Sequence, residues 1–141
     1  MRDDTEVPFL IEGYASLFGT PDRVGDVVRP GAFSASLARR PIVPMLIQHN
    51  DGAKAGRWMR ITEDGRGLCV RGLVNTGSAR RLISMGLDGL SIGFRPVLWV
   101  PRTGGGRELR VIDLVEISIV SDPMLAGARF TVGRRTMEFA A

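Results

Sequence analysis

The spacing of apolar residues predicts a chain built mainly of short β-strands. Residues 9–14 alternate in part between apolar and polar side chains, as a half-buried strand does, whereas residues 42–48 form an apolar run typical of a buried strand. Residues 57–62 and 68–74 flank a turn that contains Asp-Gly, which predicts a β-hairpin. Further segments rich in β-branched and aromatic residues complete the predicted strands at residues 90–100, 108–120 and 129–132.

Two short helices and several breaks are predicted between these strands. Residues 31–40 place apolar side chains four positions apart, and residues 76–85 begin with capping hydroxyl residues and are followed by Gly86. Residues 19–31 are dense in Gly, Pro and Asp and predict a loop. Pro96 cannot donate a backbone hydrogen bond, so the strand that contains it must lie at a sheet edge or bend there.

The composition fits a single soluble globular domain. The 141 residues are enough for one hydrophobic core, and 44% hydrophobic with 24% charged residues excludes a disordered chain. We expect one domain over residues 1–141, with its core at about residues 9–132 and a tail at residues 133–141. The strands and two short helices predict an α+β fold that is mainly β, a barrel or strongly bent sheet with helices outside.

The charge pattern, the length of the apolar runs and the cysteine count indicate which partners and which compartment fit the chain. The net charge of +4 comes from 19 basic and 15 acidic residues scattered along the chain, and the densest basic groups are only pairs. Nucleic-acid-binding domains usually carry a clustered basic stripe, so this pattern argues against direct nucleic-acid binding. No apolar run reaches the roughly 18 residues that cross a bilayer, and the acidic start does not resemble a signal peptide. The single cysteine favours a reducing compartment.

The chain has one histidine, and its position suggests catalysis. His49 follows the apolar run of residues 42–48 and opens a polar turn, so a rigid strand would present its ring to solvent. The alternative is a histidine that is merely hydrogen-bonded at the end of a strand. One histidine and one cysteine are too few for a structural zinc site, and we expect neither a metal nor another cofactor.

Ser91 is the candidate nucleophile, in the pattern Gly89-x-Ser91-x-Gly93. Flanking glycines can leave room for a substrate carbonyl beside the hydroxyl. The spacing also matches the nucleophile elbow of α/β-hydrolases, but this chain is too short for that fold and a β-rich run follows the serine. The alternative is a serine in a tight turn. Cys69 lies in mid-strand without a neighbouring glycine, which favours a buried and inert thiol over a Cys–His pair.

Glu116 is the candidate acid that would orient the histidine. On a strand it shares a face with Leu114 and Ser118, within an apolar segment where an unpaired carboxylate is costly to bury. Its partner should be either an arginine or His49, and an acid behind a histidine would hold the imidazole in one tautomer. Asp113 is the alternative acid.

Five segments occur in an order that resembles a known family. They are residues 13–18 with 26–33, 45–49, 65–68, 90–94 and 114–123. Over about residues 11–130 the chain resembles the prohead proteases, or capsid maturation proteases, of tailed phages and phage-derived gene transfer agents. The resemblance implies Ser91 as nucleophile, His49 as general base and Glu116 as the orienting acid.

The family is distantly similar to the herpesvirus assemblins, which implies an assemblin-like β-barrel surrounded by a few short helices. The third catalytic residue of assemblins is a second histidine, which this chain lacks. The resemblance also implies a serine endopeptidase inside the immature capsid, in the host cytoplasm. It would cleave the scaffolding protein or the N-terminal scaffolding segment of the major capsid protein, and also itself. A homodimer or higher oligomer would fit such an enzyme.

Two other functions stay open at this point. The first is a catalytically silent module that keeps the same fold and binds capsid or scaffold protein during assembly. The second is a small basic barrel that binds nucleic acid, which predicts exposed aromatic side chains among basic residues. Trp58, between Arg57 and Arg60, is the only sign of such a surface.

Overall fold

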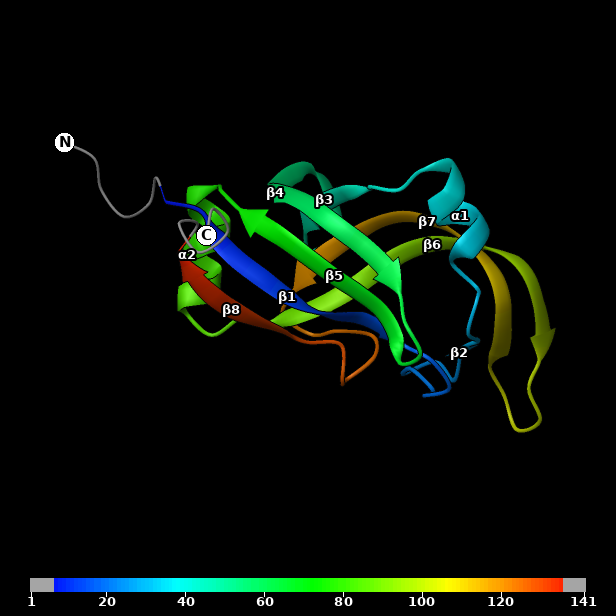
Figure 1. The fold of residues 1–141 in the computed structure, drawn as a ribbon. Coiled ribbons are helices and arrows are strands. Elements are labelled where there is room, and N and C mark those ends of the chain that lie inside the picture. Colours follow the sequence, from blue (N-terminus) through cyan, green and yellow to red (C-terminus); the bar gives the residue numbers. More distant parts are fainter. Residues whose placement is uncertain (1–6, 136–141) are drawn as a thin grey trace.

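The structure is a computed structural model that describes residues 7–135. Within that range the chain forms eight strands and two short helices (Figure 1). In chain order they are β1 (Phe9–Leu17), β2 (Val27–Val28), α1 (Ser34–Arg39), β3 (Pro44–Ile47), β4 (Asn50–Glu63), β5 (Gly67–Val74), α2 (Gly77–Ser84), β6 (Gly89–Pro101), β7 (Arg107–Val120) and β8 (Phe130–Arg135).

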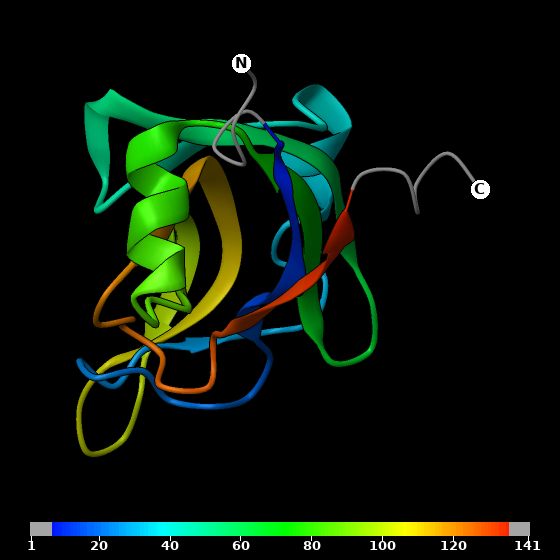
Figure 2. The ribbon, with the colours of Figure 1, turned by 90° about the vertical axis from the view of Figure 1, so that its left-hand side faces the viewer.

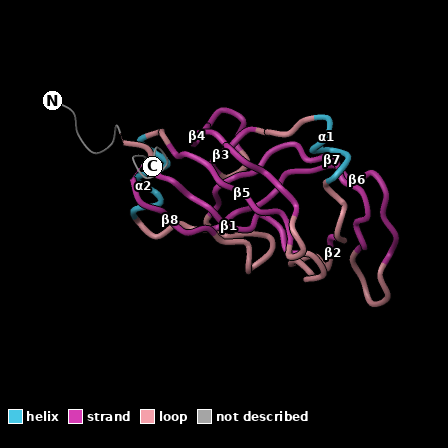
Figure 3. The backbone as a smooth tube through the Cα atoms, in the orientation of Figure 1, coloured by secondary structure: helices cyan, strands magenta, loops and turns pink. Residues whose placement is uncertain are grey.

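All the strands belong to one strongly bent sheet in the order β2-β7-β3-β4-β5-β1-β8, and β6 pairs with β7. The strands curl around a common interior (Figure 2), and the two helices lie at opposite ends of the sheet (Figure 3). Apart from β7, the only β-partner of β6 in residues 7–135 is an isolated bridge between Gly89 and Arg129. The mainly β class is therefore confirmed, but the sheet does not close into the expected barrel.

Most predicted elements are present, and the differences arise from long-range pairing. β4 begins at Asn50, directly after the turn, because β3 and β5 pair with it along its length. Val27 and Val28 form β2 inside the predicted loop, since they pair in parallel with Glu108 and Leu109 of β7. The strand containing Pro96 lies at a sheet edge and has a register irregularity next to that proline, as predicted.

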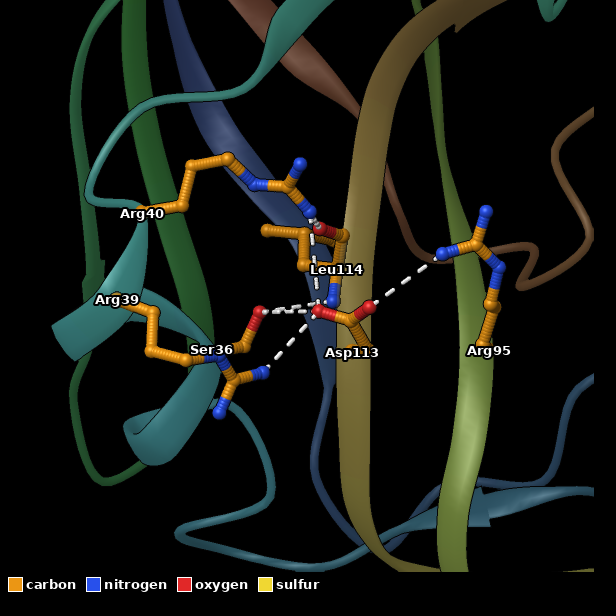
Figure 4. Close-up of polar contacts among 6 residues, drawn as sticks. All are labelled: Ser36, Arg39, Arg40, Arg95, Asp113 and Leu114. Atoms are coloured by element: carbon orange, nitrogen blue, oxygen red, sulfur yellow. Dashed lines mark hydrogen bonds and ion pairs between the residues drawn. The ribbon is translucent and has the colours of Figure 1, made fainter.

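Helix α1 lies beside the edge of β7 (Figure 4), at residues that precede the stretch of β7 paired with β3. The backbone N–H of Leu114 donates to Ser36 Oγ at 2.8 Å, and Arg40 Nη2 donates to the Leu114 carbonyl at 2.8 Å. The N–H of Ile112 donates to the carbonyl of Ala32 at 3.1 Å. These contacts satisfy backbone groups that would otherwise need another strand. No helix in residues 7–135 is long and apolar enough to span a membrane.

Trp58 was the only sign of a nucleic-acid-binding surface, and its burial in the structure removes that sign. Its side chain is only 2% exposed and belongs to the apolar core. Its indole Nε1 donates to the carbonyl of Ile117 at 3.2 Å, which ties β4 to β7. The aromatic residue that suggested base stacking therefore packs inside the protein.

Candidate active site

A strained two-residue turn between β3 and β4 presents His49. Ile47 pairs with Asn50, so Gln48 and His49 occupy the two central positions of the hairpin. Both have positive φ values, 52° and 61°, which such turns require and which usually favour Asn or Gly. A left-handed backbone conformation costs free energy in residues other than glycine, so it persists only where neighbouring groups hold it. Such conformations are common at functional sites.

Gln48 supplies contacts that hold this turn in place. Its backbone N–H donates to the carbonyl of Ile119 at 2.9 Å. Its side-chain Nε2 donates to Ser121 Oγ at 3.0 Å, and the N–H of Ser121 donates back to Gln48 Oε1 at 3.2 Å. Three hydrogen bonds therefore connect the turn to the end of β7, the strand that carries Glu116.

Of the two partners that the sequence left open for Glu116, the structure places His49 against it. His49 Nδ1 lies 2.5 Å from Glu116 Oε2, with the carboxylate side chain 9% exposed and the imidazole 43% exposed. A carboxylate can only accept, so Nδ1 carries the hydrogen and Nε2 is left without one, as a base requires. Asp113, the alternative acid, contacts arginines instead.

Ser118 links the acid to the backbone of the base. Its hydroxyl accepts a hydrogen bond from the backbone N–H of His49 at 3.0 Å and donates to Glu116 Oε1 at 2.6 Å. The side chain is fully buried. Sequence reasoning placed Ser118 on the same face as Glu116 but assigned it no role, because the contact with His49 depends on the parallel pairing of β3 with β7.

Ser91 lies within β6, directly opposite Ser118 of β7, and not in the tight turn that the sequence had left open. Ser91 and His49 both line one cavity of about 280 Å³. In residues 7–135 no hydrogen bond joins the two side chains. Such bonds often tighten only when substrate is present. The structure thus brings the predicted base and acid into contact and places the predicted nucleophile beside the same cavity.

A β-bulge in β7 determines which side chains share the face of Glu116. Gly93 pairs with Glu116 while the next residue of β6, Phe94, pairs with Leu114, so Val115 is an extra residue in β7. Leu114 consequently lies in the apolar core with Ile117. The prediction that Leu114 shares a face with Glu116 is therefore wrong, because an ideal strand period does not include the bulge.

Comparisons with known proteins identify the family of this chain. A family model described as Caudovirus prohead serine protease matches residues 1–141. The chain belongs to this family. The prohead protease of Enterobacteria phage HK97 is 35% identical over 107 residues, which cover 65% of this chain and 48% of that protein. The chain therefore spans about half the length of this curated relative.

The fold of this prohead protease family member also resembles solved herpesvirus proteases. The protease of Kaposi's sarcoma herpesvirus (KSHV) has a TM-score of 0.64 at 12% identity, covering 90% of this chain and 65% of that one. The varicella-zoster virus protease has a TM-score of 0.61 at 14% identity, covering 89% and 64%. The assemblin-like fold is thereby confirmed.

The two glycines around Ser91 have a packing role in this family member. A Cβ atom on Gly93 would lie 2.8 Å from Cδ of Glu116, and one on Gly89 would lie 2.6 Å from the carbonyl oxygen of Val120. Real Cβ atoms essentially never approach so closely. The glycines therefore let β6 pack against β7 and leave space for the Glu116 carboxylate, whereas the sequence suggested space for substrate.

The lining of the cavity also includes alternate residues from Thr20 to Val28 and, after β7, Met124 and Leu125. Asp26 is buried there, and its carboxylate accepts hydrogen bonds from Arg107 Nε at 3.2 Å and Nη2 at 2.7 Å. Cys69 does not line this cavity; burial raises the pKa of its thiol, which agrees with an inert residue. Within residues 7–135 no group of three metal-ligating side chains occurs.

We expect His49 to titrate at a higher pH than an ordinary histidine. The hydrogen bond to Glu116 raises the pKa of His49 and outweighs partial burial, which lowers it. The charged imidazolium should therefore persist above the usual midpoint of about 6.5. The chain has one histidine, so a single Cε1 proton resonance followed by NMR from pH 5 to 9 measures this midpoint. A midpoint at or below the ordinary value would contradict the contact with Glu116.

Proposed function

We propose that this chain is a serine endopeptidase with Ser91 as nucleophile, His49 as general base and Glu116 as the acid that orients the base. The observation that carries the proposal is the contact of the only histidine with a buried carboxylate, beside a cavity that Ser91 also lines. Membership in the prohead serine protease family supports it.

The arrangement supports acyl transfer in two steps. His49 Nε2 takes the proton of Ser91 while Oγ attacks a substrate carbonyl carbon, and the same proton then passes to the leaving amine. A water molecule, deprotonated by His49, hydrolyses the acyl-enzyme and restores Ser91. Glu116 accepts the hydrogen bond from His49 Nδ1 and stabilises the imidazolium formed in each step, which is consistent with the raised pKa of His49.

The free edge of β6 offers a place for the substrate backbone. Ser91 lies on this edge strand, whose other side is paired with β7. The backbone N–H of Leu90 donates to the carbonyl of Ala128 at 2.8 Å, so within residues 7–135 the free part of this edge begins after Leu90. Extended polypeptides commonly bind by adding a strand to such an edge, because the unpaired backbone groups then find partners. A flexible, extended segment of another protein would fit this geometry better than a folded surface.

The substrate that we propose is the scaffolding protein, or the N-terminal scaffolding segment of the major capsid protein, inside the immature capsid. Cleavage of the chain itself would use the same site. The 35% identity to the HK97 prohead protease supports this assignment. The presence and arrangement of the three proposed catalytic residues disfavour a catalytically silent assembly module.

Co-expression with the major capsid protein of the same genome tests the proposal. We expect intact-mass analysis to show a defined N-terminal loss from the capsid or scaffolding protein, absent when either is expressed alone. A fluorophosphonate probe should add its phosphonyl mass at Ser91, with fluoride leaving and the hydroxyl proton passing to His49. Unchanged capsid and scaffold masses in assembled particles that contain this chain, with no labelling, would favour the silent assembly module.

A further inference from the structure

Asp113 is surrounded by more positive charge than it can neutralise (Figure 4). Three guanidinium groups, two from the end of α1 and one from β6, converge on this single carboxylate. The nitrogen–oxygen distances are 3.3 Å from Arg39, 3.7 Å from Arg40 and 3.6 Å from Arg95. Ser36 Oγ also donates to the carboxylate, at 3.4 Å. One negative charge among three positive charges leaves an excess of two, which favours an anionic partner.

Arg95 is the arginine of this group that a ligand can recruit most easily. Its side chain is 74% exposed, and Asp113 is its only ion-pair partner in the described part of the chain. Arg40 is also held by the carbonyl of Leu114, and Arg39 lies closer to Asp113 than Arg95 does. If Arg95 turned toward a ligand, Asp113 would therefore keep two cationic partners and would not become an unpaired charge.

The position of Arg95 relates it directly to Ser91. Both residues lie on β6, four residues apart, which corresponds to about 13 Å along a strand. Their even spacing puts them on the same face of β6. The bulge at Val115 brings Asp113 onto the face of Glu116, so the arginine group lies on the face that carries the proposed catalytic residues.

We propose that Arg95 selects substrates that carry an acidic side chain about four residues from the scissile bond. This inference rests on the proposed function. A substrate strand along the free edge of β6 would place one residue opposite Ser91 and another, about four residues away, opposite Arg95. Directly opposed residues on one face lie within reach of each other, and opposite charges there attract. The acidic side chain would take Arg95 from Asp113.

Cleavage of a proteome-derived peptide library measures this selection, because such a library presents acidic and neutral side chains at every distance from a cleavable bond. We expect Asp and Glu to be enriched about three- to fivefold, three to five residues from the cleaved bond and on one side of it. Arg95→Gln should abolish the enrichment, whereas Arg81→Gln, on the exposed face of α2, should retain it. Equal cleavage of acidic and neutral peptides, or enrichment that survives in Arg95→Gln, would overturn the inference.

A binding experiment separates failure of this inference from failure of the proposed function. Ser91→Ala and Ser91→Ala/Arg95→Gln are compared for affinity toward the intact major capsid protein and scaffolding protein, at low and high salt. We expect Arg95→Gln to weaken the binding of whichever intact protein is the substrate, several-fold at low salt and little at high salt, because salt screens exposed charges. Equal affinities would overturn the inference even where no peptide is cleaved. Loss of affinity for a short DNA duplex, with capsid and scaffold binding unchanged, would also overturn it and assign the arginines to nucleic acid.

Discussion

Replacing Ser91 with alanine is expected to leave the capsid or scaffolding protein at full length under conditions in which the unchanged chain processes it completely. Loss of a nucleophilic serine removes the covalent step, and in a serine protease where this was measured it lowered kcat by about 10⁶. The substitution should leave the fold intact, because no hydrogen bond of the Ser91 hydroxyl is present in residues 7–135 and alanine fits within a strand. Intact-mass spectrometry of co-expressed proteins measures processing, and thermal unfolding measures stability.

The matched control for this experiment is Ser84→Ala, which removes an exposed hydroxyl from the end of α2, outside the residues that line the cavity. It should process the substrate at the unchanged rate. Processing by Ser91→Ala at a similar rate, with a melting temperature close to that of the unchanged chain, would exclude Ser91 as the nucleophile.

Glu116→Gln is expected to lower kcat/KM by about 10³- to 10⁴-fold while preserving the shape of the side chain. An amide in place of the carboxylate can donate to His49 Nδ1, which favours the wrong tautomer, and it cannot stabilise the imidazolium. The pKa of His49 should also fall toward its ordinary value, because the hydrogen bond to Glu116 is the main cause of the increase. The residual activity should therefore reach half its maximum at a lower pH, since the neutral imidazole is the active form.

Two other carboxylates of β7 sharpen this test. Glu108→Gln removes a charge that pairs with Arg110, outside the cavity, and should leave the pH profile and the rate unchanged. Asp113→Asn decides between the two acids that the sequence left open. The proposal would be contradicted if the pH of half-maximal activity shifted in Asp113→Asn and stayed unchanged in Glu116→Gln. That result would identify Asp113 as the orienting acid.

Local sequence features determined the type and approximate position of most elements. Apolar runs and alternation placed the main strands because side-chain period and burial act over only a few residues. The missing N–H of Pro96 predicted an edge strand or a bend, and Gly86 predicted the end of α2. The chain contains one histidine, so the sequence by itself identified His49 as the only possible imidazole base.

The tertiary structure decided the features that depend on pairing between distant segments. The extra residue at Val115 moved Leu114 into the core, and the antiparallel pairing of β6 with β7 made glycine necessary at Gly93. The parallel pairing of β3 with β7 brought Ser118 beneath His49. No local pattern encodes a bulge, a register or the failure of β6 and β8 to form a ladder. These depend on the balance of contacts across the whole sheet, and that balance positions the acid and the base.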